Sequence, residues 1–271
     1  MVIFDLDGTL LDDKGEIGRD TVDLVKKLDN YGVQFSFASG RLHSALTDYA
    51  AQLKIHTPLI SLDGCLIQSY PAGTTIYQSV MPVKHVLKTI ALAEKFLVKF
   101  ALCHADAIYF TEHNSLIADL IDKFGAKYEE VHSYTNLVDK TLEIVLVSEF
   151  KDYIKEIEKR LSFPYSLGLT TTYSKSYQNP GMYLLEIRKH GSSKATGLKK
   201  LASHLKIGIS ETAVIGDWYN DKSLFDTKAV KVAVANAVPE IKFLSDYVTQ
   251  RSNDEDGVAE FLEMLYKAKV D

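Results

Sequence analysis

Two carboxylates follow the first apolar stretch of the chain. Residues 2–4 are apolar, and Asp5, Asp7 and Gly8 come directly after them. An apolar run that ends in acidic residues and glycine predicts a buried strand leading into a turn. Side chains two apart on a strand share a face, so Asp5 and Asp7 can address one site. Acidic turns are also common on surfaces, so a catalytic role depends on partners elsewhere in the chain.

A hydroxyl and a glycine follow the second apolar stretch. Residues 33–38 predict another buried strand, and Ser39, Gly40 and Arg41 come next, ahead of a helix-like run over residues 42–53. A hydroxyl at a strand end, a permissive glycine and a helix N-terminus together make a place to hold phosphate. Ser-Gly before a helix is also an ordinary helix cap.

Further chemistry-bearing residues lie in the last third of the sequence. Lys194 stands near the start of a predicted helix, where acidic residues are usually preferred, so it needs a local anion unless it is simply exposed. The buried strand expected at residues 212–215 is followed by Asp217, Asn220 and Asp221. Two more acidic side chains and an amide are therefore expected at the end of another strand.

These residues would gather four carboxylates around one pocket. Mutual repulsion among Asp5, Asp7, Asp217 and Asp221 would raise some of their pKa values unless cations intervene. Lys194 and a hard divalent metal such as Mg2+ supply the missing positive charge.

The elements around these residues predict an α/β protein. A strand, a helix over residues 19–31 and a second strand favour a parallel sheet. A third strand is expected at residues 58–62 and a hairpin over 65–81. Later strands are expected at 230–235 and 247–249, with helices at 238–244 and 258–266. Residues 1–81 and 189–271 would thus form a Rossmann-like, doubly wound parallel sheet core.

The middle of the chain has a different pattern. Residues 82–188 contain no motif for chemistry and predict a separate α/β module. Its expected elements are helices at 83–96, 115–124 and 153–161, strands at 100–110 and 141–147, and a strand-rich stretch over 165–188. The residues alone leave it open that this module is an ordinary second domain with its own binding function.

Composition excludes several classes of protein. The 271 residues are 46% hydrophobic and 25% charged, which is typical of a globular protein that buries a core. A net charge of −5 argues against a nucleic-acid surface. Two distant cysteines support neither a disulfide framework nor a zinc site. No stretch resembles a signal peptide or a membrane span, so we expect a cytoplasmic protein with no membrane partner; the sequence leaves its oligomeric state open.

Four motifs in the chain resemble those of the haloacid dehalogenase-like (HAD) superfamily, most of whose members are phosphatases. They are DLDGTLL at residues 5–11, Ser-Gly-Arg at 39–41, Gly-x-x-Lys at 191–194 and Gly-Asp-x-x-Asn-Asp at 216–221. The insertion over residues 82–188 resembles a C2 (C2B-like) cap domain of the Cof-type subgroup. Related families often carry Asn-Gly where this chain has Asp63-Gly64.

The resemblance implies a role for each matching residue. Asp5 would be the nucleophile and Asp7 the general acid and base. Mg2+ would be bound by the Asp5 side chain, the Asp7 backbone carbonyl and Asp217, while Asp221 would orient Lys194 or bound water. Lys194 would pair with Asp5 and the phosphate. The other phosphate-binding residues would be Ser39, Gly40, Arg41 and Asn220.

The leading interpretation is a Mg2+-dependent phosphatase that hydrolyses small phosphomonoesters, such as sugar phosphates or phosphorylated cofactors, through an aspartyl-phosphate. A phosphosugar transferase or phosphomutase on the same core is one alternative. A non-enzymatic, phosphate-responsive module like a receiver domain is another, although Asp7 argues against it because a water-activating residue would shorten the lifetime of the phosphoaspartate. The expected partner is a small phosphorylated metabolite.

Overall fold

The computed structural model of the chain describes residues 1–111, 126–175 and 181–270. The helix expected at residues 115–124 lies outside this range. The described residues form two compact units. The first comprises residues 1–40, 46–77 and 193–271, and the second comprises 41–45 and 78–192. The boundaries expected from sequence, 81/82 and 188/189, are close to these, and the assignment of the units as catalytic core and cap remains a prediction.

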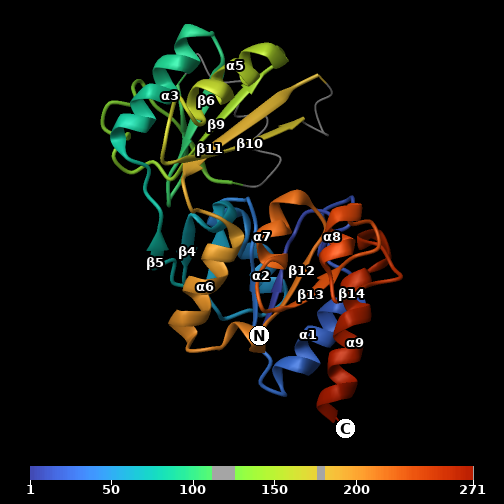
Figure 1. Cartoon of the computed structure of the whole chain (residues 1–271). Coiled ribbons are helices and arrows are strands. Elements are labelled where there is room, and N and C mark those ends of the chain that lie inside the picture. Colours follow the sequence, from blue (N-terminus) through green and yellow to red (C-terminus); the bar gives the residue numbers. More distant parts are fainter. Residues whose placement is uncertain (112–125, 176–180, 271) are drawn as a thin grey trace. The chain divides into compact units, whose positions relative to one another are not determined.

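A five-stranded parallel sheet forms the centre of the first unit (Figure 1). The strand order is β14-β13-β12-β1-β2, and every neighbouring pair is parallel. The strands are β1 (Val2–Phe4), β2 (Phe35–Phe37), β12 (Ala213–Gly216), β13 (Val230–Ala233) and β14 (Tyr247–Val248). In this register Phe4 lies between Ile215 and Phe37. The parallel sheet expected from the strand, helix, strand order is confirmed.

Helices cover the sheet of the first unit. Helices α1 (Arg19–Asp29) and α9 (Gly257–Val270) pack together on one side of the sheet, and α6 (Lys194–Leu205) lies on the other (Figure 1). Helix α1 forms as its pattern predicts, because Leu24, Val25 and Leu28 line one helical face and are buried. Shorter helices complete the unit: α2 (Thr47–Gln52), α7 (Lys222–Phe225) and α8 (Pro239–Leu244).

The helix expected at residues 42–53 is shorter than its sequence pattern suggested. A 3-10 turn at His43–Ala45 comes first, and α2 begins only at Thr47. The hydrophobic spacing over 42–53 is real, but it is satisfied by two short elements instead of one helix. The helix N-terminus that was expected directly after Ser39 is therefore absent at that position.

The second unit is built on a six-stranded sheet of order β10-β11-β9-β6-β7-β8. Its strands are β6 (Lys99–Cys103), β7 (Ile108–Phe110), β8 (Tyr128–Glu130), β9 (Glu143–Ser148), β10 (Leu169–Lys175) and β11 (Tyr183–Lys189). Helices α3 (Val83–Lys95) and α5 (Lys151–Leu161) pack on one face of the sheet over an apolar core (Figure 1). The single strand expected at residues 100–110 is two antiparallel strands, β6 and β7.

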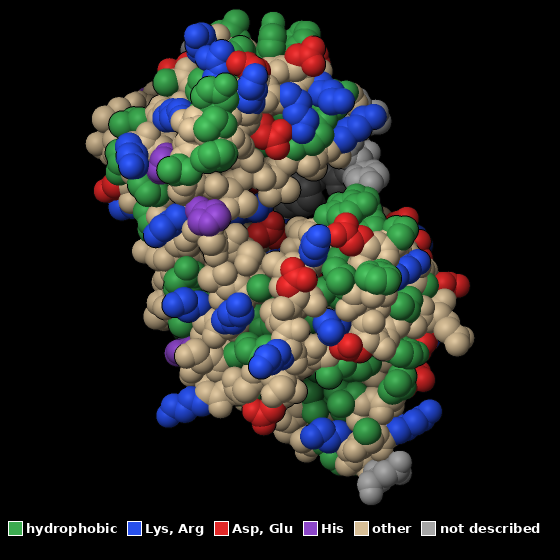
Figure 2. Space-filling view, in the orientation of Figure 1, with side chains coloured by type: hydrophobic (Ala, Val, Ile, Leu, Met, Phe, Trp, Pro, Cys, Tyr) green, Lys and Arg blue, Asp and Glu red, His purple; other side chains and the backbone are tan. Residues whose placement is uncertain are grey.

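Buried charges in the second unit are paired. The Arg188 guanidinium donates to the Glu143 and Glu186 carboxylates and to the Thr172 hydroxyl. Glu143 and Arg188 are both almost fully buried, so each needs the other to offset the cost of desolvation. On the surface, Lys and Arg are interspersed with Asp and Glu over the face shown in Figure 2. Among the described residues, no helix combines the length and apolar character needed to cross a bilayer.

A tight turn connects two strands of a small third sheet in the first unit. The sheet has the order β3-β4-β5, with strands β3 (Leu59–Ser61), β4 (Leu66–Gln68) and β5 (Thr75–Gln78). Between β3 and β4, Leu62, Asp63 and Gly64 have consecutive positive φ angles of 47°, 46° and 89°. Side-chain-bearing residues rarely adopt this left-handed conformation. At Gly64 the chain passes close to the backbone of Ser193, the residue before α6.

We expect Gly64→Ala to destabilise the protein far more than Gly32→Ala. Both glycines have positive φ, so each alanine costs on the order of 1 kcal/mol in backbone strain. A Cβ atom at Gly64 would additionally lie 2.0 Å from the backbone oxygen of Ser193, whereas a Cβ at Gly32 would meet nothing within 4 Å. Urea unfolding of both variants measures the difference. Equal losses in the free energy of unfolding would show that the turn does not pack tightly on α6.

Candidate active site

The carboxyl ends of two neighbouring strands bring the first pair of acids together. β1 and β12 are parallel and adjacent, so Asp5 after β1 and Asp217 after β12 emerge at the same edge of the sheet. The Asp5 backbone N–H donates to the Ile215 carbonyl at 2.9 Å, which continues the ladder to the start of the site. Both carboxylates are buried, with 4% of Asp5 and 6% of Asp217 exposed.

Lys194 connects the acids of the site. Its Nζ donates to Asp5 Oδ1 and to Asp221 Oδ1, each at 2.7 Å, and the lysine is fully buried. It is the first residue of α6, and the side chain of the preceding Ser193 accepts a hydrogen bond from the Thr196 N–H, which caps the helix. The anion that a lysine needs at a helix start is therefore a pair of carboxylates.

Asp221 is fixed by three hydrogen bonds. Its Oδ1 accepts from Lys194, and its Oδ2 accepts from the backbone N–H groups of Asp217 and Trp218 at 3.0 and 3.2 Å. Both oxygens of Asp221 are thus engaged within the protein. Such a carboxylate is suited to orienting Lys194 and the 217–221 loop.

Two residues of the site were not singled out from the sequence. Thr9 Oγ1 donates to Asp217 Oδ1 at 2.7 Å, and Asn236 Nδ2 donates to the Gly8 carbonyl oxygen at 2.7 Å. Thr9 belongs to the same turn as Asp5, so a hydroxyl in that turn was an available signal. Asn236 follows β13 in an unremarkable stretch, and only the folded sheet places it near Gly8.

Burial and mutual repulsion shift the pKa values of these groups. Burial first, and then the charge of Asp221, raise the pKa of Asp5 well above its ordinary range, against the attraction of Lys194. The same two causes raise the pKa of Asp217 to about 7, although the Thr9 hydrogen bond lowers it. Burial lowers the pKa of Lys194, but Asp221 and Asp5 outweigh this effect and the net pKa is raised. Lys194 alone leaves the site with excess negative charge.

This charge imbalance fits a divalent cation. Carboxylate oxygens of Asp5, Asp217 and Asp221 all lie within 4.8 Å of one another, and oxygen ligands of this kind suit Mg2+. Because both Asp221 oxygens are engaged, Asp5 and Asp217 are the side chains better placed to bind a metal. Asp7 is exposed, and its charge contributes to the raised pKa of Asp217.

The residues expected to bind phosphate are only partly brought together. Ser39 is buried at the end of β2, and its backbone oxygen accepts from the Asp63 N–H at 3.0 Å. Asn220 Nδ2 donates to Asp63 Oδ1 at 3.4 Å, so Asp63 lies between Ser39 and Asn220. Gly40 is the last residue of its segment in the first unit, whereas Arg41 belongs to the segment 41–45 that groups with the second unit.

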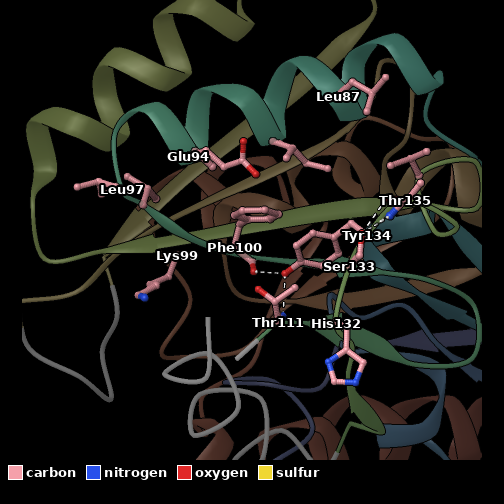
Figure 3. A pocket seen from close by; sticks show the side chains of 14 residues that line it. Leu87, Glu94, Leu97, Lys99, Phe100, Thr111, His132, Ser133, Tyr134 and Thr135 are labelled. Atoms are coloured by element: carbon pink, nitrogen blue, oxygen red, sulfur yellow. Dashed lines mark hydrogen bonds between the residues drawn. The ribbon is translucent and has the colours of Figure 1, made fainter. Parts of the chain in front are cut away.

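A cavity of about 610 Å³ lies in the second unit and contains none of these residues (Figure 3). Leu87 and Glu94 of α3, Phe100 of β6 and Tyr134 are among the side chains that line it. The Tyr134 hydroxyl accepts from the Thr111 N–H and donates to the Phe100 carbonyl oxygen, each at 3.1 Å. Its polar group therefore serves the internal structure of this unit, and the cavity has no part in the acid-lysine site.

A family model described as haloacid dehalogenase-like hydrolase matches residues 2–262, and the chain belongs to this family. The family and enzyme class implied by the sequence motifs are thereby confirmed.

Several curated relatives of the chain are named phosphatases. The chain is 26% identical to phosphatase YwpJ of Bacillus subtilis, over 98% of this chain and 99% of the relative. It is 24% identical to the 5-amino-6-(5-phospho-D-ribitylamino)uracil phosphatase YitU of the same organism, over 98% and 97%. Among solved structures, a haloacid dehalogenase-like hydrolase from Bacteroides thetaiotaomicron matches with a TM-score of 0.85 at 23% identity, over 97% and 98% of the two chains, which shows the shared fold.

Without a divalent cation, the contribution of Asp217 to thermal stability should fall as the pH rises from about 4 to 7. The pKa of Asp217 is about 7 in the folded protein, against an ordinary value near 3.8. The folded state therefore binds a proton that the unfolded chain has already released, and this contribution to stability is lost as the pH rises through 7. Melting temperatures in chelator measure the slope.

Two controls isolate this effect. Saturating Mg2+ should reduce the slope by stabilising the charged carboxylates, and Asp217→Asn should remove the part due to Asp217 without metal because the amide does not titrate, leaving the part due to Asp5. Identical slopes in chelator, in Mg2+ and in the variant would exclude Asp217 as the source.

Proposed function

We propose that this chain is a Mg2+-dependent phosphatase that hydrolyses small phosphomonoesters through an aspartyl-phosphate on Asp5. The observation that carries the proposal is the fully buried Lys194, which joins Asp5 to Asp221 beside Asp217. A buried lysine on a carboxylate keeps that carboxylate oriented and offers positive charge to an incoming phosphoryl group. Membership in a hydrolase family with phosphatase relatives agrees with this chemistry.

Two displacements at phosphorus make up the reaction. In the first, an Asp5 oxygen attacks phosphorus and the ester P–O bond breaks, while Asp7 gives a proton to the leaving oxygen. In the second, Asp7 takes a proton from water, which attacks phosphorus and breaks the bond to Asp5, releasing inorganic phosphate. Asp7 suits proton transfer with solvent because it is exposed, unlike Asp5.

Mg2+ would be bound by the side chains of Asp5 and Asp217 and the backbone carbonyl of Asp7. When bound, the ion supplies positive charge that offsets carboxylate repulsion and stabilises the charge on the transferring phosphoryl group. Thr9 and Asp221 keep Asp217 and Lys194 in place through hydrogen bonds. Ser39, Gly40, Arg41, Lys194 and Asn220 would bind the phosphate.

A small phosphorylated metabolite is the proposed substrate. The relative YitU is named for a phosphate ester of a ribitylamino-uracil, and a compound of that size fits the proposal. A transferase or phosphomutase would use the same first step but would pass the phosphoryl group to an acceptor other than water. The release of inorganic phosphate over many turnovers in water distinguishes hydrolysis from both transfer and a stable phosphorylated module.

Asp5→Asn should abolish phosphatase turnover and leave the fold intact. The amide keeps the size of the side chain but cannot act as the nucleophile, so kcat should fall by on the order of 10³-fold or more. Release of phosphate from p-nitrophenyl phosphate with Mg2+ measures the loss, and circular dichroism checks the fold. Asp13→Asn, which changes an exposed acid in the same segment, is the matched control. Near wild-type turnover in Asp5→Asn would refute the mechanism.

The second unit should select the substrate. Every proposed catalytic residue lies outside residues 82–188, and phosphoryl transfer needs mainly positioning and charge, which the first unit can supply to any monoester. Exchange of this segment for a related cap should reorder kcat/KM across a panel of phosphate esters while the need for Mg2+ and Asp5 persists. A well-folded exchange that keeps the original order would place selectivity in loops of the first unit.

A further inference from the structure

Asp63 occupies a strained turn inside the proposed phosphate site. It lies in the left-handed region with φ 46° and ψ 39°, between Leu62 and Gly64, which also have positive φ. Non-glycine residues persist in this conformation only where their surroundings impose it, and such residues cluster at functional sites. Asp63 is also 95% buried. A buried carboxylate in such a turn needs partners that offset the cost of its burial.

Its contacts join three parts of the site that are far apart in sequence. The Asp63 N–H donates to the Ser39 carbonyl oxygen, and the Asp63 Oδ1 accepts from Asn220 Nδ2. The same oxygen lies 3.4 Å from the place that a Cβ atom would occupy on Gly40. The carboxylate therefore packs against the turn after β2 and bonds to the loop after β12. Its charge also acts on Lys194, as one of the acids that raise the lysine pKa against the opposing effect of burial.

The chemistry of the Asn220 side chain gives this contact a consequence. An ionised carboxylate only accepts hydrogen bonds, whereas an amide presents an NH2 group at one end and an oxygen at the other. Asp63 therefore selects the NH2 end of Asn220 and uses one of its two hydrogens. The direction of the second hydrogen is then fixed by the planar geometry of the amide.

We propose that Asp63 is a positioning residue for phosphate recognition, which orients the Asn220 amide so that its second N–H donates to the phosphoryl group. The inference rests on the proposed function, because it requires that Asn220 meet the phosphate. It assigns no contact between Asp63 and the substrate: the residue acts through its neighbour.

The positioning role and simple electrostatics predict opposite results for the charge-neutral variant Asp63→Asn. Loss of a negative charge near a phosphate dianion should tighten phosphate binding. Loss of the acceptor that orients Asn220 should weaken it, because an amide at position 63 can present either end to its neighbour. Asparagine tolerates the left-handed conformation as aspartate does, so this variant leaves the strained turn in place.

The test measures competitive inhibition by inorganic phosphate, together with KM and kcat for p-nitrophenyl phosphate in Mg2+. In Asp63→Asn, the inhibition constant and KM should both rise by about 5-fold or more while kcat changes by less than about 2-fold. In an Asn220→Ala background, the same substitution should no longer raise the inhibition constant, because the residue through which Asp63 acts is gone and only the loss of negative charge remains.

Asp256→Asn is the matched control. Asp256 also has a positive φ, of 56°, and its carboxylate accepts from the Thr21 N–H at 3.0 Å near the start of α1. Its neutral variant should lower the melting temperature without changing phosphate inhibition, which separates a general loss of stability from a loss of recognition.

Two results would overturn the proposal while leaving the proposed function intact. One is an inhibition constant in Asp63→Asn that is unchanged or lower. The other is an equal increase in the wild-type and Asn220→Ala backgrounds, which would show that Asp63 does not act through Asn220. A wild-type protein that releases no phosphate from any ester with Mg2+ would instead refute the proposed function itself, and the positioning role with it.

Discussion

The site depends on one buried cluster of three charged side chains. Lys194 is fully buried and bonds to both Asp5 and Asp221. A buried charge without its partner costs about 3–5 kcal/mol, so the end of β1, the first turn of α6 and the loop after β12 must meet at one point for the fold to be stable. The hydrogen bond that offsets the buried charge of Lys194 also orients Asp5, the proposed nucleophile. Stability and function are therefore coupled in this cluster, with excess negative charge left for a cation.

The parts of the fold that could be predicted from sequence are those set by local pattern. The apolar runs that became β1 and β12 are short, continuous and followed by acids, so both the strands and the convergence of Asp5 with Asp217 could be expected. Lys194 was conspicuous because its charge opposes the usual preference at a helix start, and the structure supplies the anions it needs. The central parallel sheet followed from the alternation of strands and helices.

What could not be predicted depends on tertiary contacts or on weak turn signals. Residues 104–107, which separate β6 from β7, include neither glycine nor proline, so Asp106 was the only local signal of a turn. The periodicity of residues 42–53 suits a helix, yet the structure divides it between a 3-10 turn and α2. The contact of Asn236 with Gly8 spans 228 residues, and the conformation of Asp63 arises from packing on segments distant in sequence.

The division of the first unit into separated stretches of sequence affects the order in which the chain can fold during synthesis. Strand β1 has β2 as one neighbour early, but its other neighbour, β12, begins at Ala213, after all of residues 78–192 have been made. The inserted unit is nearly continuous in sequence. It can complete its sheet before the five-stranded sheet of the first unit, whose strands precede and follow it in the chain. During synthesis on the ribosome, we therefore expect β1 to keep an unpaired edge until the last third of the chain emerges. An unpaired strand edge is prone to aggregation.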